Sequence, residues 1–188
     1  MYSDAQAAAL YDVLNPWDGA RFAGDAFYTG LVMAAEAVLD VGCGTGSMLR
    51  HARTLGHRGR LVGLDPDQAM LARARRRTDI EWVSGSAADA AWDREFDLAT
   101  MTGHAFQCLV GDEELHASLV AVRAALTDAG RFAFETRHPA ARAWQQWERQ
   151  VSEVTDPDGR PLRVSYHIES VIGDVVTLTE IITIARRS

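Results

Sequence analysis

Short apolar runs recur along the first 135 residues, and segments with helical spacing separate them. A continuous apolar run bounded by turn residues is typical of a strand that is buried on both faces. We expect such strands at 37–41, 61–64, 80–84 and 95–101, with a fifth inside 126–135. We expect helices at 47–55, 67–77 and 112–126. Regular alternation of strand and helix predicts an α/β fold built on a parallel sheet.

Residues 1–36 are expected to form an N-terminal helical cap. Ser3 is placed to cap a helix from Asp4 to Leu14, and Asn15-Pro16 would end it. A second short helix is expected from Asp25 to Ala35. The cap therefore precedes the first strand and leaves a core at 37–150.

The remaining part of the chain has a different pattern. Pro139 is expected to start a helix from Ala140 to Arg149. Strands are then expected at 151–155, 162–171 and 175–185, with turn residues between them. Polar and apolar residues alternate clearly at 163–168, which indicates that one face meets water. The pattern predicts an antiparallel β meander at 151–188, an extension of the same domain as the core.

Three glycines follow the first strand at alternate positions, Gly42, Gly44 and Gly46. Glycine accepts a positive φ and lets a ligand approach the backbone closely. A strand, a tight turn and a helix start present backbone N–H groups and the positive end of a helix dipole to a nucleotide-like ligand. Dinucleotide sites use G-x-G-x-x-G, whereas here the third glycine comes one residue early. The G-x-x-x-x-G-K-[ST] phosphate loop is absent from the sequence.

The run from Val38 to Gly46 resembles the first motif of the class I S-adenosylmethionine-dependent methyltransferases, V-L-D-x-G-C-G-x-G. The resemblance implies a doubly wound, mostly parallel Rossmann-like sheet with helices on both faces and S-adenosylmethionine as cofactor. The turn, with Cys43 among its glycines, would hold the methionine part of the cofactor. Asp40 would support that loop.

Asp65 stands at the end of the second strand, about 20 residues after the glycine turn, where an acid accepts hydrogen bonds from ribose hydroxyls. The alternative role for Asp65 is to cap the helix at 67–77, but Asp67 or Pro66 can begin that helix instead. The family commonly has G-D-A after the third strand, where this chain has Ser86 and Ala87 bordering the expected adenine, with Asp89 as an alternative contact. The further residues that we assign to the cofactor are Pro66, Met70, Met101, Thr102 and Gly103.

The methyl acceptor is expected at the loop after the fourth strand, because ligands bind where the strand order of an open sheet reverses. His104 and Gln107 are the best-placed polar side chains in that loop. His104 is the first candidate for a general base and His138, next to Arg137 after the fifth strand, is the second. A local hydrogen bond is the alternative role for a single loop histidine.

Tyr11 and Trp17 are expected to contact the acceptor from the cap. The resemblance implies such a lid for N-terminal segments of methyltransferases that act on small molecules. Packing of the cap helices against the sheet is the alternative interpretation for both aromatic residues.

The net charge of −7 argues against a partner held by nucleic-acid phosphates. The arginines within 73–77 are a local exception, which we interpret as a solvated helix end. Two cysteines, Cys43 and Cys108, do not form a disulfide framework, so a reducing, cytoplasmic setting is expected. We expect no signal peptide, no membrane span and no metal.

The C-terminal pattern also suggests an internal deletion between Thr179 and Glu180. Residues 180–187 resemble the final strand of the family, directly after the meander, and the sixth strand and its helix have no counterpart. The fifth strand would then be an exposed edge, and pairing with a second copy along it is one consequence that we consider.

We therefore expect a methyltransferase that acts on a small molecule. Two other interpretations stay open at this stage. The first is a protein that binds the cofactor without turnover, and the second is an NAD-linked oxidoreductase.

Overall fold

The computed structural model describes residues 4–156 and 158–184. The described chain divides into two compact units, with the boundary between Thr136 and Arg137. The first unit contains the expected cap as well as the parallel core, and the second begins before residue 151.

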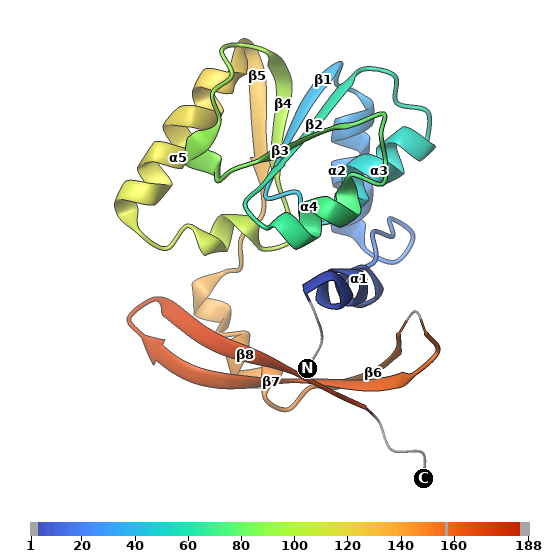
Figure 1. Cartoon of the computed structure of the whole chain (residues 1–188). Helices are drawn as coiled ribbons and strands as arrows, with labels where there is room; N and C mark the ends of the chain where they lie inside the picture. The colour runs from blue at the N-terminus through green and yellow to red at the C-terminus, as the bar shows by residue number, and fades with distance from the viewer. Residues whose placement is uncertain (1–3, 157, 185–188) are drawn as a thin grey trace. The chain divides into compact units, whose positions relative to one another are not determined.

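The elements of the first unit follow the predicted order (Figure 1). They are α1 (Asp4–Leu14), α2 (Ala23–Met33), β1 (Ala37–Val41), α3 (Ser47–Thr54), β2 (Arg60–Asp65), α4 (Gln68–Ala74), β3 (Glu81–Ser84), η1 (Ala87–Asp89), β4 (Phe96–Met101), η2 (Ala105–Cys108), α5 (Asp112–Ala125) and β5 (Leu126–Phe134). Every predicted strand of the core is present, and most boundaries shift by one or two residues. The expected cap at Ser3 lies outside the described residues.

Sheet A has the strand order β3-β2-β1-β4-β5, and all of its pairs are parallel. The chain starts in the middle of the sheet, moves outward through β2 and β3, and returns to the other side of β1 with β4. The order therefore reverses between β1 and β4, whose carboxyl ends lie next to each other. This arrangement confirms the doubly wound sheet.

Both faces of sheet A are covered, which is why its strands are continuous apolar runs. On one face, Leu39 and Val62 pack with Val122 of α5. On the other face, Val38 and Leu61 pack with helices α2 and α3. Figure 1 shows α5 on the opposite side of the sheet from α2 and α3.

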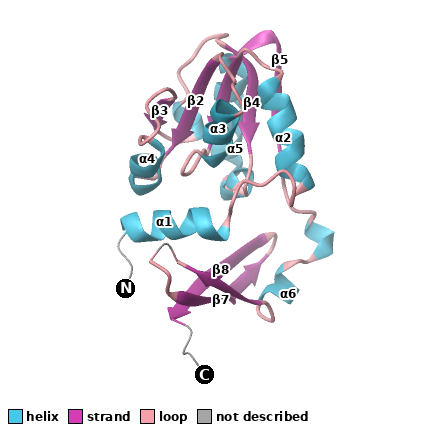
Figure 2. Ribbon diagram, turned by 90° about the vertical axis from the view of Figure 1, so that its right-hand side faces the viewer, coloured by secondary structure: helices cyan, strands magenta, loops and turns pink. Residues whose placement is uncertain are grey.

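The second unit holds η3 (Pro139–Ala141), α6 (Trp144–Trp147), β6 (Val151–Thr155), β7 (Pro161–Ile172) and β8 (Val175–Ile184). The three strands form an antiparallel sheet in the order β6-β7-β8, as predicted (Figure 2). The single helix expected from Ala140 to Arg149 is wrong. Arg142 takes a left-handed conformation with φ of 43°, which interrupts the helix and leaves two short pieces.

Strand β8 runs without interruption through the point of the suggested deletion. Thr179 pairs with His167 and Glu180 with Tyr166, so both sides of that point belong to the same ladder with β7. Among the residues that the structure describes, no helix is long and apolar enough to cross a membrane.

Candidate functional site

The glycine turn between β1 and α3 has left-handed backbone at all three glycines, with φ of 70° at Gly42, 56° at Gly44 and 74° at Gly46. The three differ in their surroundings. A Cβ on Gly42 would meet the Cβ of Ala105 at 2.5 Å, and one on Gly46 would meet the Trp82 ring at 2.2 Å. A Cβ on Gly44 would approach only Tyr11, at 4.0 Å. Gly42 and Gly46 are therefore needed for packing, whereas Gly44 leaves room for a ligand.

Hydrogen bonds hold this turn against the end of β2. The N–H groups of Gly42 and Cys43 both donate to the carbonyl of Leu64, at 2.8 and 3.1 Å. The Cys43 side chain is buried, and burial raises the pKa of its thiol well above the ordinary value. Cys43 is therefore a packed thiol at neutral pH.

Asp65 joins the two strand ends at the turn. Its Oδ2 accepts from the Gly44 N–H at 2.7 Å, and its Oδ1 accepts from the Asp67 N–H at 2.8 Å. Asp67 in turn caps α4, accepting from Ala69 and Met70, so Asp65 is not needed as the helix cap. Burial raises the pKa of Asp65 even though the two N–H groups oppose the shift. Each carboxylate oxygen keeps a further lone pair for a ribose hydroxyl.

Asp40 is 3% exposed and accepts one side-chain hydrogen bond, from Thr100 Oγ1 at 2.9 Å. Burial raises its pKa to about 7, with a smaller contribution from the charge of Asp65. Within the described residues neither Asp40 nor Asp65 makes an ion pair. The turn thus places two acids close together without a cation.

Tyr11 reaches this acidic turn from α1. Its ring lies near Gly44, and its hydroxyl lies 3.8 Å from the position of a Cβ on Gly103. The pKa of the phenol is raised, mainly by burial and to a smaller extent by the negative charges of Asp65, Asp12 and Asp40. Tyr11 therefore lies between the two strand ends, where a cap residue was expected.

Asp12 fixes α1 to the glycine turn, a role that was not predicted from the sequence. Its carboxylate accepts from Thr45 Oγ1, from Arg50 Nη2 at 3.1 Å and from Arg73 Nε at 2.5 Å. These hydrogen bonds, together with the two arginine charges, lower its pKa against the effect of burial. The partners lie 33 to 61 residues away in the chain, so no local pattern could have identified them.

On the expected adenine side, Ser86 and Asp89 bind each other. The Ser86 hydroxyl and N–H both donate to Asp89 Oδ2, at 2.7 and 2.8 Å. The two residues form a capping box at the start of η1, which commits one oxygen of Asp89 and part of the acceptor capacity of the Ser86 hydroxyl. Ala87 is buried beside them, and Met70 lines a cavity of about 470 Å³ between α1 and the start of α4.

Strand β4 ends at the buried Met101, and the loop after it begins with Thr102 and Gly103. The Gly103 N–H donates to Glu135 Oε1 at 2.8 Å, which ties the loop to the end of β5. His104 has a left-handed backbone with φ of 81°, and its Nδ1 lies 3.4 Å from Gln107 Nε2. The two predicted acceptor residues are therefore neighbours, at the point where the strand order reverses.

The other predicted residues have different surroundings in their own units. Trp17 packs with the core residues of α2 and α3 and donates its indole N–H to Thr29 Oγ1 at 3.0 Å. Arg137 and His138 belong to the second unit, where the Arg137 guanidinium lies 4.5 Å from the Trp147 ring centre. Within the first unit, the structure thus brings Tyr11, His104 and Gln107, but not Trp17, to the predicted site.

Comparison with known proteins agrees with this geometry. A family model described as a methyltransferase domain matches residues 38–130. The 2-phytyl-1,4-naphtoquinone methyltransferase of Thermosynechococcus vestitus is 33% identical over 117 residues, which are 59% of this chain and 51% of that protein. The cypemycin N-terminal methyltransferase of a Streptomyces species is 32% identical over 133 residues, 69% of this chain and 53% of that protein. The chain spans about half the length of these curated relatives.

Among solved structures, Streptomyces venezuelae DesVI superposes with a TM-score of 0.73 over 98% of this chain and 84% of that one, at 23% identity. This likeness shows a shared fold. The matched residues 38–130 contain the glycine turn, Asp65, Ser86 and the loop after β4. Residues 38–130 thus match a methyltransferase domain, and the fold is that of the class I S-adenosylmethionine-dependent methyltransferases.

Proposed function

We propose that this protein transfers a methyl group from S-adenosylmethionine to a small-molecule acceptor. The observation that carries the proposal is the pair of buried acids at the glycine turn, Asp40 and Asp65, for which no cation is found within the described residues. S-adenosylmethionine carries a positive sulfonium and an ammonium group, so its charge complements the turn. The open space at Gly44 gives the ligand access to the backbone.

In this proposal Asp65 holds the ribose, and the turn residues Gly42, Cys43, Gly44 and Gly46 surround the methionine part. When bound, the cofactor supplies an activated methyl group that an acceptor lone pair displaces. The chain's own contribution is to place the acceptor in line with that methyl group. Tyr11 and Gln107 would position the acceptor.

His104 would take the acceptor's proton where the acceptor must lose one before attack. Its Nδ1 faces Gln107, and a glutamine amide N–H can donate to that nitrogen. Such a bond would leave Nε2 protonated, so proton transfer at Nδ1 requires the Gln107 contact to yield. A base is unnecessary for an acceptor that attacks as a neutral amine.

The acceptor is proposed to be a small molecule and not a nucleic acid or a membrane lipid, because the chain is acidic, with a net charge of −7. The relatives named above act on a naphthoquinone and on the N-terminus of cypemycin, so the atom methylated is left open. We also propose a cytoplasmic setting and a homodimer that pairs along β5, an edge strand of sheet A among the described residues.

The test is calorimetric titration with S-adenosylhomocysteine. Losing hydrogen bonds to a charged group removes about 1.5–3 kcal/mol, so Asp65→Ala is expected to weaken binding by ~10-fold or more. Gly44→Ala is expected to weaken it at least as much, because the added methyl group occupies the ligand's approach. Absence of binding by the folded wild type would contradict the proposal.

Gly56→Ala is the matched control for Gly44→Ala. Gly56 also has a positive φ, of 95°, and its Cβ would meet nothing within 4 Å, so both variants carry similar backbone strain. Only Gly44 lies at the turn, so Gly56→Ala should leave the affinity unchanged. Release of S-adenosylhomocysteine with a panel of amines, hydroxyls and carboxylates then separates an enzyme from a protein that only binds the cofactor.

A further inference from the structure

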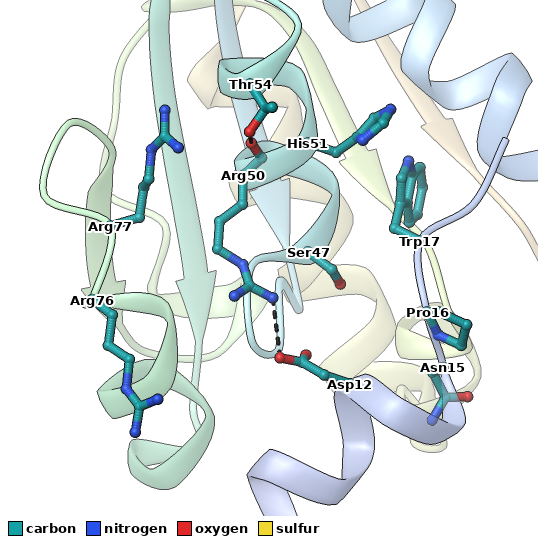
Figure 3. A pocket seen from close by; sticks show the side chains of 10 residues that line it. All are labelled: Asp12, Asn15, Pro16, Trp17, Ser47, Arg50, His51, Thr54, Arg76 and Arg77. Atoms are coloured by element: carbon teal, nitrogen blue, oxygen red, sulfur yellow. Dashed lines mark hydrogen bonds and ion pairs between the residues drawn. The ribbon is translucent and has the colours of Figure 1, made fainter. Parts of the chain in front are cut away.

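A second cavity, of about 550 Å³, lies on the outer side of α3 (Figure 3). It is bordered by the end of α1, the segment after it, one face of α3 and the residues that follow α4. None of the predicted cofactor residues lines it, and of the predicted acceptor residues only Trp17 does. Its volume is in the range of small-molecule sites.

The wall of this cavity is basic. Arg50 of α3 and Arg76 and Arg77 after α4 line it, against one acid, Asp12. The last two arginines belong to the basic run that the sequence analysis assigned to a solvated helix end. Arg76 is exposed just after α4, as that interpretation expects, and the structure also brings Arg76 and Arg77 to the same cavity as Arg50 of α3.

The three arginines differ in how far they are already neutralised. Arg77 is paired with Asp79, with Nε–Oδ1 at 2.6 Å. Arg50 donates from Nη2 to Asp12, and 30% of its side chain remains exposed. Arg76 makes no ion pair in the described part of the chain and is exposed to solvent. Donor capacity therefore remains at Arg50 and Arg76.

The opposite wall is aromatic. In Figure 3, Trp17 and His51 border one side of the cavity and Arg76 and Arg77 the other, with Arg50 and Ser47 between them. The indole N–H of Trp17 is already bound to Thr29, so the ring offers chiefly apolar and stacking contact. Guanidinium groups suit phosphate oxygens because they are planar and can donate two parallel hydrogen bonds.

We propose that this cavity binds a phosphorylated small molecule with a flat ring, as a nucleotide has. The phosphate groups lie against Arg50 and Arg76, and the ring lies against Trp17. The site is separate from the proposed cofactor turn, so it does not depend on the methyltransferase assignment. It gives a binding role to arginines that the proposed reaction does not use.

The test uses calorimetric titration with inorganic pyrophosphate and with uridine diphosphate at low salt. Both titrations are run with saturating S-adenosylhomocysteine and without it. Wild type should bind both compounds, with affinity falling as salt rises, and the bound cofactor product should leave the stoichiometry unchanged. Loss of binding when S-adenosylhomocysteine is present would place the phosphate compounds at the cofactor turn and overturn the proposal.

Arg76→Gln should weaken both compounds by ~10-fold or more, since a charge-assisted contact is lost. Arg75→Gln is the matched control: Arg75 is the neighbouring exposed arginine, follows the same helix and does not line the cavity. It should change affinity by less than ~2-fold. Equal losses in the two variants would mean a diffuse basic surface, not a site.

Trp17→Leu tests the aromatic wall. Only uridine diphosphate has a ring that can stack on Trp17, and such stacking strengthens binding. Wild type should therefore bind uridine diphosphate at least ~5-fold more tightly than pyrophosphate. The variant should lose that difference and keep its affinity for pyrophosphate. Equal affinities of wild type for both probes would contradict a ring site at Trp17, and absence of binding by either probe would overturn the whole inference.

Discussion

The two units each bury an aspartate, and they treat its charge in opposite ways. Asp40 in the parallel sheet accepts one side-chain hydrogen bond, and burial raises its pKa to about 7. Asp156 in the antiparallel unit accepts from the N–H groups of Asp158 and Arg160 and from the Arg160 guanidinium at 2.7 Å. Burial opposes ionisation of Asp156 too, but the bonds from Arg160 outweigh it and lower the pKa.

The difference separates an acid used for folding from an acid available for a ligand. The charge of Asp156 is satisfied by its own turn, four residues or fewer away in the chain. The charge of Asp40 has no cationic partner within the described residues, and a buried charge without one is unfavourable. A cation that arrives from outside would relieve it. The glycine turn is therefore expected to be more stable with a positively charged ligand than alone.

The largest expected effect is on the pH dependence of stability. The pKa of Asp40 is about 7 in the folded protein and 3.8 ordinarily, so between these values the folded state holds the proton more tightly. Stability from this group therefore falls as pH rises through that window. The free energy of unfolding of Asp40→Asn, compared with that of wild type, should therefore be about 3 kcal/mol more favourable at pH 8 than at pH 5. Urea unfolding at both pH values measures this difference.

Asp156→Asn is the control with the opposite sign. Because the pKa of Asp156 is lowered in the folded protein, its ionised carboxylate stabilises the fold at every pH above the ordinary pKa of an aspartate. That stabilisation is lost only as the pH falls through the lowered pKa. Both test conditions lie above that range, so Asp156→Asn should be destabilised to the same extent at pH 5 and pH 8. If the free energies of unfolding of Asp40→Asn and wild type changed equally between pH 5 and pH 8, the distinction between the two aspartates would be wrong.

Periodicity and local chemistry were enough to predict much of the fold. The strands of sheet A are continuous apolar runs because helices cover both faces. The Asp67 cap follows from a local spacing, and the place of Asp65 follows from the end of the second strand, about 20 residues after the glycine turn. The interruption at Arg142 was not predictable, because a left-handed arginine leaves no mark in a helical pattern.

Long-range contacts explain the other omissions. The hydrogen bonds that Asp12 accepts join α1 to Thr45, Arg50 and Arg73, which lie in three later parts of the chain. The different roles of Gly44 and Gly46 depend on Trp82, which lies on β3 and packs over only one of them. The sequence shows three equivalent glycines, and only tertiary packing separates them.

An intermediate effect is expected on cofactor affinity. If ionised Asp40 favours the ammonium group of the ligand, affinity for S-adenosylhomocysteine should rise ~10-fold from pH 6 to pH 8, because a pKa of about 7 lies between them. Titration in buffers of different ionisation enthalpy should detect the proton released on binding. Asp40→Asn should bind with little dependence on pH. The same slope in both proteins would assign the titration to another group.

The smallest effect is expected from the pair that satisfies Asp156. Arg160 is partly exposed, and exposed ion pairs contribute little, so Arg160→Gln should lower the thermal midpoint at pH 7 by only ~1–4 °C. Arg163→Gln, on strand β7 of the same sheet, makes no ion pair among the described residues and is the matched control. The Arg160 effect should vanish as the pH falls below the pKa of Asp156, because the carboxyl is then neutral. Persistence of the difference in acid would mean that the arginine stabilises the turn through its packing, and the contrast with Asp40 would then no longer rest on charge.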